Sequence, residues 1–246
     1  MSNLKGFALG SALLCLMGCG GGIVGQQQPR VRLFNGADGQ AVVFASFQDA
    51  SLVNLGMSPN AAFGSATADT IITNTTATAT ISAPSGPLVT TQPTLFRVGS
   101  FYTVYAYGAA SPGYHGLVLE DSQSIASGGN VGVRAVELGK NAPAVDIFFN
   151  LAASQANGGP LFSNLQLGLV SGSANTTQAV DLNGYVLFPT NSSTLYAVTV
   201  TAHGSTTPIA STTVTVSPGS YYTIVVFDTG GATTQTSAAI LNDHRT

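Results

Sequence analysis

The chain has 246 residues, of which 44 % are hydrophobic and 7 % are charged, and its formal net charge is −3. An ordinary soluble domain carries about 25 % charged residues, so Ser, Thr, Asn and Gln fill most polar positions here. The apolar residues occur in short periodic runs, which excludes a disordered chain. A weak negative charge without a basic cluster excludes a nucleic-acid-binding protein.

The first 19 residues predict the destination of the protein. Lys5 precedes a short apolar run at residues 6–17, which is too short for the roughly 20 residues of a membrane-spanning helix. This pattern indicates a secretory signal peptide over residues 1–18. Its end, Leu16-Met17-Gly18-Cys19, resembles the bacterial lipoprotein signal, in which the leader is cut before a Cys that receives a diacylglyceryl group.

Cys19 is therefore the predicted lipid attachment residue. Two alternatives are acylation of Cys15, which lacks a small residue directly before it, and an ordinary cysteine in an ordinary signal peptide. Residues 19–29 form the lipidated N-terminus and a flexible tether, and about nine coil residues span roughly 15–18 Å. The first domain is thus expected close to the membrane. Gly20, in place of Asp, resembles the pattern that directs lipoproteins to the outer membrane of Gram-negative cells.

Three sequence patterns recur in the same order. A Val-Arg pair opens an apolar run, a polar turn and a second apolar run at residues 29–47 and again at residues 131–150. Residues 98–107 resemble residues 218–227, and residues 118–121 resemble residues 240–243. The echoes predict two copies of one domain, at residues 30–123 and 131–246, with residues 123–130 as the connector.

Strand patterns dominate both copies. Residues 77–82, 197–202 and 212–217 alternate apolar residues with Thr or Ser, which is typical of half-buried strands. Turn pairs such as Asn35-Gly36 and Pro218-Gly219 separate the strands. No run has a convincing helical period, so we expect an all-β fold made of antiparallel β-sandwiches.

Two features distinguish the middle of the copies. Residues 102–107 and 221–227 have bulky side chains on both faces, so we expect central strands covered by the core on one face and by a loop or the sister domain on the other. The second copy is longer, since Val133 follows Val31 by 102 residues but Tyr222 follows Tyr102 by 120. Residues 154–182 are the expected place of this insertion, as a long loop or an extra hairpin.

Residues 133–149 resemble the opening of a bacterial surface-domain family, domain of unknown function 4397. Ala142-Pro143-Ala144-Val145-Asp146 fits the core of its motif, and residues 218–222 and 241–243 fit its later signals. The resemblance covers residues 131–246 well and residues 29–122 loosely, where Phe44 stands in place of Asp146. It implies tandem immunoglobulin-like β-sandwich domains on secreted proteins and lipoproteins, and it implies no reaction.

Candidate reactive residues are few. His115, His203 and His244 have no metal-ligand spacing, so each is expected at a strand end or in a loop, and no Gly-x-Ser-x-Gly motif is present. We therefore predict no catalytic residue, no cofactor and no metal.

Three carboxylates recur at matched ends of the copies: Glu120 and Asp121 in the first, Asp243 in the second. They could form a calcium site at each domain's edge, or they could lie at a turn or strand terminus where Asp bonds its own backbone. The lack of an Asp-x-Asp run favours the second interpretation. Asp146 is either a ligand or the outward position of a strand, and its alternation with apolar neighbours favours the strand.

Tyrosines cluster in both copies. They could form an aromatic platform for a sugar or peptide, or they could fill the core and the inter-domain contact. The absence of Trp, the strongest stacking residue, favours packing. The members are Tyr102, Tyr105, Tyr107, Tyr114, Tyr221 and Tyr222.

The sequence thus predicts a non-enzymatic, lipid-anchored cell-envelope protein, in the outer membrane if the cell is Gram-negative. It would serve as a binding or spacer module whose partners are the membrane, through its anchor, and an envelope protein or glycan ligand. The alternative is an adhesin-like surface module that binds carbohydrate or protein through its tyrosines and residues 154–182. An envelope hydrolase is the least supported class.

Overall fold

The computed structural model describes residues 27–122, 126, 129–141, 144–151, 159–171, 176, 179–190, 192–229 and 235–243. The predicted signal peptide, Cys19, most of the tether and His244 lie outside the described residues. The same holds for Ala142, Pro143 and parts of the 154–182 segment. The described residues form eighteen β-strands and no α-helix. None of them belongs to a helix long and apolar enough to cross a membrane.

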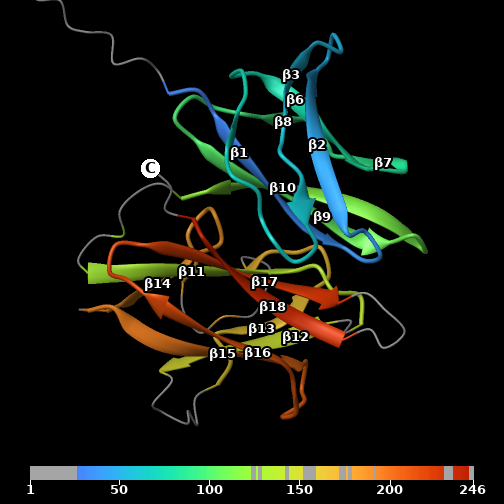
Figure 1. The fold of residues 1–246 in the computed structure, drawn as a ribbon. Coiled ribbons are helices and arrows are strands. Elements are labelled where there is room, and N and C mark those ends of the chain that lie inside the picture. The colour runs from blue at the N-terminus through green and yellow to red at the C-terminus, as the bar shows by residue number, and fades with distance from the viewer. Residues whose placement is uncertain are drawn as a thin grey trace, which may run out of the picture.

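The first unit is a sandwich of two sheets (Figure 1). One sheet has the order β10-β9-β1-β5 and the other β3-β2-β6-β7, with β4 beside β2 and β8 beside β6. The strands are β1 (Arg30–Ala37), β2 (Val42–Asp49), β3 (Asn54–Met57), β4 (Ala61–Ala62), β5 (Thr70–Ile71), β6 (Thr76–Ala83), β7 (Gly86–Thr90), β8 (Thr94–Leu95), β9 (Phe101–Ala109) and β10 (Gly113–Asp121).

The second unit has the same plan. Its sheets have the orders β14-β11-β17-β18 and β13-β12-β15-β16. The strands are β11 (Asn130–Glu137), β12 (Ala144–Leu151), β13 (Phe162–Gln166), β14 (Val186–Pro189), β15 (Thr194–Ala202), β16 (Pro208–Val216), β17 (Tyr221–Thr229) and β18 (Gln235–Asn242). The prediction of an all-β fold built from β-sandwich units is confirmed.

One strand pair in each unit departs from the expected antiparallel arrangement. β1 pairs with β9, and β11 pairs with β17, in parallel, whereas the other paired strands are antiparallel. Residue alternation indicates which face of a strand is buried but not which strand lies beside it, so the sequence could not reveal these pairs. The parallel pairing matters because it places Arg32 directly opposite Thr103, and Arg134 opposite Thr223.

Each unit has its own apolar core. Along β1, Val31 and Leu33 point into the first core, whereas Arg32 and Phe34 lie on the outer face of the sheet. The second core is built in the same way from β11, β12, β15 and β17. Disulfide bonds are absent from the described residues because both cysteines precede residue 27. Apolar burial, worth about 1.5–3 kcal/mol per large side chain, therefore stabilises each sandwich.

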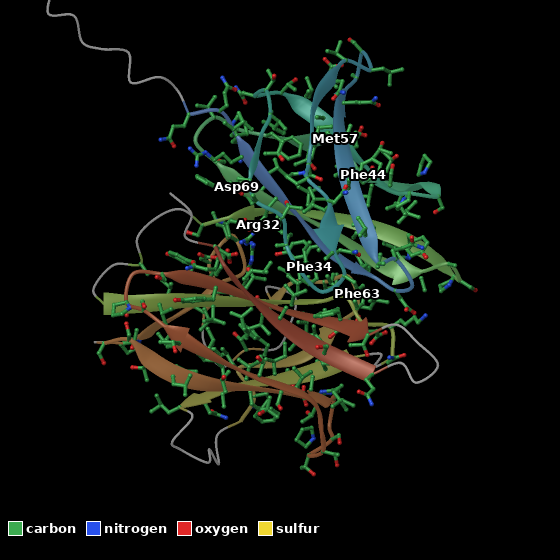
Figure 2. All side chains as sticks on the ribbon, viewed as in Figure 1. Arg32, Phe34, Phe44, Met57, Phe63 and Asp69 are labelled. Atoms are coloured by element: carbon green, nitrogen blue, oxygen red, sulfur yellow. The ribbon has the colours of Figure 1, made fainter. Side chains whose placement is uncertain are left out.

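The outer faces of the β1-β9 and β11-β17 sheets pack against each other. β9 and β17 are consequently buried on both faces over most of their length. The prediction that residues 102–107 and 221–227 are central strands covered on both faces is confirmed, and of the two expected covers, a loop or the sister domain, the structure shows the sister unit. Figure 2 shows Arg32, Phe34 and Phe63 along the boundary between the units.

Candidate functional site: the interface between the two units

An apolar cluster forms the middle of the interface. Phe34 and Tyr105 come from the first unit, and Val225 and Phe227 come from the second. The rings of Phe34 and Phe227 meet edge to face with centroids 5.5 Å apart, and Phe63 meets Phe227 at 5.7 Å. Such pairs add about 0.5–1.5 kcal/mol to the burial of their surfaces. The two units therefore share a third core.

Arg32 links β1 to the end of the second unit and is only 6 % exposed. Its Nε donates to Oγ1 of Thr103 at 2.8 Å, within its own sheet. Its Nη1 donates to the carbonyl oxygen of Asn242 at 2.8 Å, and its Nη2 pairs with the carboxylate of Asp243. One guanidinium thus joins β1 and β9 to the last strand of the other unit.

Arg134 makes the reverse connection and is 1 % exposed. Its Nε donates to Oγ1 of Thr223 at 2.8 Å. Its Nη1 donates to the carbonyl oxygen of Glu120 at 2.8 Å, and its Nη2 pairs with Asp121. Arg134 therefore repeats the contacts of Arg32 with the two units exchanged. Each arginine binds a threonine of its own sheet, and a backbone carbonyl and an aspartate of the other unit.

The two threonines complete the exchange. Oγ1 of Thr103 donates to Oδ2 of Asp121 at 2.7 Å, and Oγ1 of Thr223 donates to Oδ2 of Asp243 at 2.5 Å. Each aspartate is therefore held by a threonine of its own unit and an arginine of the other. Reciprocal contacts of this kind characterise the twofold interface of a homodimer, although both halves here belong to one chain.

Two glycines also occupy equivalent positions on the two sides of the interface. Gly64 of the first unit lies against the ring of Phe227, which a Cβ atom would approach to 3.2 Å. Gly168 of the second unit lies against Tyr107, whose hydroxyl would be 2.7 Å from a Cβ atom. Both glycines have positive φ, 72° and 74°, so a side chain there would be strained as well as crowded.

The buried charges balance. Two guanidinium groups face two carboxylates, so the cluster has no formal net charge. Burial opposes the charge of Arg32, but Asp121 and Asp243 outweigh it and raise the pKa of Arg32 above its ordinary value. Burial and the neighbouring Asp121 raise the pKa of Asp243. Arg134 and Arg32 act in the opposite direction, but the pKa stays above its ordinary value. Desolvation offsets most of the attraction in such a cluster, whereas removal of one partner would leave a buried charge unpaired.

Two tyrosines border the cluster. The ring of Tyr185 lies 4.6 Å from the guanidinium carbon of Arg134, and its hydroxyl donates to Asp243 at 2.8 Å. The buried hydroxyl of Tyr105 has no hydrogen-bond partner in the described part of the chain, and burial raises its pKa to about 12. Tyr105 is thus held by packing alone.

The matched carboxylates have a role that neither interpretation of the sequence included. Asp121 ends β10 and Asp243 directly follows β18, so their predicted place at strand termini is confirmed. Their partners, however, are the arginines of the opposite unit. The side chain of Glu120 accepts from Ser100 at 2.6 Å and pairs with Arg97 at 3.3 Å. The described residues contain no group of three or more His, Cys, Asp or Glu side chains that could hold a metal.

Asp146 lies on the outward side of β12, as predicted, but β13 and the turn after β15 cover it. Its carboxylate accepts from Ser163 Oγ, Asn164 N, His203 Nδ1 and Gly204 N at 2.8–3.0 Å. Burial alone would raise the pKa of Asp146, but these donors lower it to about 2. Ser163 donates to Asp146 and not to His203, so the group lacks the serine–histidine contact of a catalytic triad.

The other candidates within the described residues lie in or beside strands. His203 follows β15, as expected for a strand end, whereas His115 lies within β10 and its ring is 5.2 Å from that of Tyr107. The tyrosines fill cores and the interface, so the packing interpretation is confirmed and the aromatic platform is not supported. Tyr102, Tyr105, Tyr221 and Tyr222 are each at most 6 % exposed. Within residues 154–182 the described part forms β13, an edge strand beside β12 that corresponds to β3 of the first unit and so is not an added hairpin.

Arg32 and Arg134 were not predicted as site residues. The signal was present, because a Val-Arg pair opens both copies in a chain with only seven Lys and Arg residues. Charged residues are almost never fully buried unless they are paired, so an arginine repeated inside an apolar run indicates a buried partner. The partner could not be identified, since Asp243 lies 211 residues from Arg32.

The comparisons with known proteins identify part of this architecture. Residues 29–148 match the model of a family described as "Domain of unknown function (DUF4397)". A domain of this family is therefore present at residues 29–148, which confirms the family seen in the sequence but not a tandem second copy. The match lies mainly on the first unit and ends within β12, whereas the sequence motifs indicated the clearer resemblance in the second unit.

No curated protein matches the chain. Solved structures that resemble the chain include two candidate cell adhesion proteins. The protein from Bacteroides eggerthii has 13 % identity, with 88 % of this chain and 96 % of that chain covered, and a TM-score of 0.19. The protein from Parabacteroides distasonis has 10 % identity, with 89 % and 97 % covered, and a TM-score of 0.20. At these TM-scores the likenesses support no conclusion on function.

Proposed function

We propose that the protein is a non-enzymatic, lipid-anchored module of the bacterial cell envelope whose two β-sandwich units act as one rigid body. The observation that supports this most strongly is the reciprocal use of Arg32, Arg134, Asp121 and Asp243 to fix the units together. These groups hold shape rather than perform a reaction. A rigid body on a short tether suits a spacer or a platform that presents loops to an envelope protein or glycan.

The second unit is a second copy of the DUF4397 domain. The matching strand orders, the two parallel strand pairs and the reciprocal arginines support this assignment. Tandem copies joined in one chain have a practical consequence, because the connector supplies a high effective concentration of each unit for the other. The interface then forms without a separate association step.

The anchor is the acyl group on Cys19, with cleavage before that residue and retention in the envelope, in the outer membrane if the cell is Gram-negative. Its support is the sequence of residues 1–19. One acyl chain holds a protein only marginally, and burial of each further methylene is worth about 0.8 kcal/mol, so a diacylglyceryl group retains the protein stably.

The test compares Cys19→Ala with the matched variant Cys15→Ala in the native host or a related bacterium. The parent and Cys15→Ala are expected in the membrane fraction, with a mass that includes the lipid at the mature N-terminus. Cys19→Ala is expected to lose the lipid. A parent protein whose mature N-terminus carries no fatty acid would refute the anchor.

A further inference from the structure

The exposed large apolar side chains of the first unit have an unusual distribution. Among residues 27–122 they comprise Leu52 (76 % exposed), Val53 (54 %), Met57 (55 %), Ile71 (62 %) and Leu95 (49 %). Single exposed apolar residues are normal on a protein surface, but a group at one place indicates a contact. We call these five residues the apolar end.

Strand register places Leu52, Val53, Ile71 and Leu95 at the same end of the sandwich, with Met57 farther along β3. Leu52 and Val53 form the turn after β2, and Met57 pairs with Ser46 on that strand. Ile71 pairs with Arg30 at the start of β1. Leu95 pairs with Thr76 on β6. The next residue of β6, Ala77, pairs with Asp49 at the end of β2. Figure 1 shows the β2–β3 turn at the end of the first unit that points away from the second unit.

The turn that carries Leu52 and Val53 is built to present them. Oδ1 of Asp49 accepts from the backbone N–H groups of Ser51 and Val53 at 2.8 and 3.0 Å. Leu52 N–H donates to the carbonyl oxygen of Asp49 at 3.0 Å. These bonds hold Leu52 at φ 61°, a conformation that costs a residue with a Cβ atom about 1–2 kcal/mol. The most exposed side chain of the apolar end is thus fixed in a defined position.

The chain enters the first unit at this same end. Gly99 N–H donates to the carbonyl oxygen of Gln27 at 2.6 Å, and Asn74 N–H donates to the side chain of Gln28 at 3.3 Å. Few residues separate this point from Cys19, so a tether of roughly 15–18 Å would hold the apolar end near the acyl chains.

We propose that the apolar end rests on the lipid bilayer in which Cys19 is anchored, with Leu52 and Val53 inserted at the boundary between headgroups and acyl chains. This inference rests on the proposed lipid anchor. It assigns an orientation: the first unit lies on the membrane and the apolar end is the contact. Insertion removes these apolar side chains from water, and the free energy of apolar burial then stabilises the contact.

The charges at this end indicate which lipids it accepts. Arg30 and Arg97 are accompanied by Asp49, Asp69 and Glu120, so neither sign dominates. Arg97 pairs with Glu120, and Asp49 binds its own turn. Without a basic cluster the contact does not depend on anionic lipid, and it persists at high salt.

The chain has no Trp, so a single introduced Trp reports its own surroundings. Leu52→Trp and the matched control Leu195→Trp, 48 % exposed on β15 in the sheet farthest from the first unit, are introduced into the full lipidated chain. Each protein is reconstituted in phosphatidylcholine vesicles, with and without brominated acyl chains. Flotation of the vesicles measures anchoring independently of the Trp signal.

The Leu52→Trp protein is expected to shift its emission to shorter wavelength on vesicles. Brominated lipid is expected to quench it severalfold more than the Leu195→Trp protein, equally at low and high salt. Flotation of the Leu52→Trp protein without a shift or quenching overturns the membrane contact while leaving the anchor intact. Failure to float overturns both. An emission shift of the Leu52→Trp protein in detergent-free solution that grows with protein concentration instead assigns the apolar end to a second copy of the chain, and also overturns the proposal.

Discussion

Arg134→Met tests whether the buried arginines hold the units together. The substitution keeps an unbranched side chain of similar volume, so a cavity contributes little. It removes the hydrogen bonds to Thr223 and Glu120, the ion pair with Asp121 and the contact with the Tyr185 ring. Truncation of one partner of a buried pair leaves an uncompensated charge and costs about 3–5 kcal/mol.

The assay is urea unfolding, followed by circular dichroism because the chain has no Trp. Arg97→Met is the matched control, since its pair with Glu120 is exposed, with side chains 63 % and 32 % accessible. An exposed pair contributes about 0–1 kcal/mol. The account predicts a much larger loss of unfolding free energy for Arg134→Met than for Arg97→Met.

A double-mutant cycle separates the pair from the fold around it. Asp121→Asn removes the charge that Arg134→Met leaves unbalanced, so the double variant is expected to lose at least about 1 kcal/mol less than the two single losses added together. Equal costs for Arg134→Met and Arg97→Met, or strict additivity in the cycle, would refute the reasoning.

The other predictions concern single contacts. Gly168→Ala is expected to cost about 1–3 kcal/mol of unfolding free energy because its Cβ atom would crowd the Tyr107 hydroxyl. Gly39→Ala is the control for backbone strain alone, since Gly39 has φ +77° and no atom within 4 Å of a Cβ atom. Equal losses of unfolding free energy in urea would contradict the close approach. Tyr105→Phe removes a buried hydroxyl without a partner in the described chain, so its midpoint is expected to be unchanged or higher; a loss above about 1 kcal/mol would reveal a missed bond. The folded pKa of Asp146, about 2, lies below its ordinary 3.8, so its stabilisation, about 2 kcal/mol, is present above pH 3.8 and is lost as the pH falls toward 2. Asp146→Asn should flatten that acid limb of the stability curve, and an unchanged limb would assign it to other groups.

Local patterns predicted the strands well because alternation is a local property. Residues 77–82 lie in β6, residues 197–202 in β15, and residues 212–217 in or directly after β16. Bulky residues on both faces of β9 and β17 also predicted cover on two faces. Such patterns record how much of a strand is buried, and the fold class follows from them.

The site was harder to predict because its partners are remote in the sequence. Asp121 and Asp243 could be recognised from the sequence as matched carboxylates. A carboxylate pattern, however, does not distinguish a cation ligand from the partner of a buried arginine. Arg32 and Arg134 could be recognised as unusual only by their place within apolar runs. Exchange of partners between two copies is a property of the assembled chain, and no local pattern of residues encodes it.

We propose that the reciprocal interface fixes the two units as one rigid body. The most direct measurement is a distance distribution between spin labels at Thr90→Cys on β7 and Thr213→Cys on β16, both exposed strand positions, in the chain from residue 27, which contains no natural cysteine. A rigid body is expected to give one narrow distribution, which broadens in Arg134→Met. A broad or divided distribution in the parent chain would contradict it.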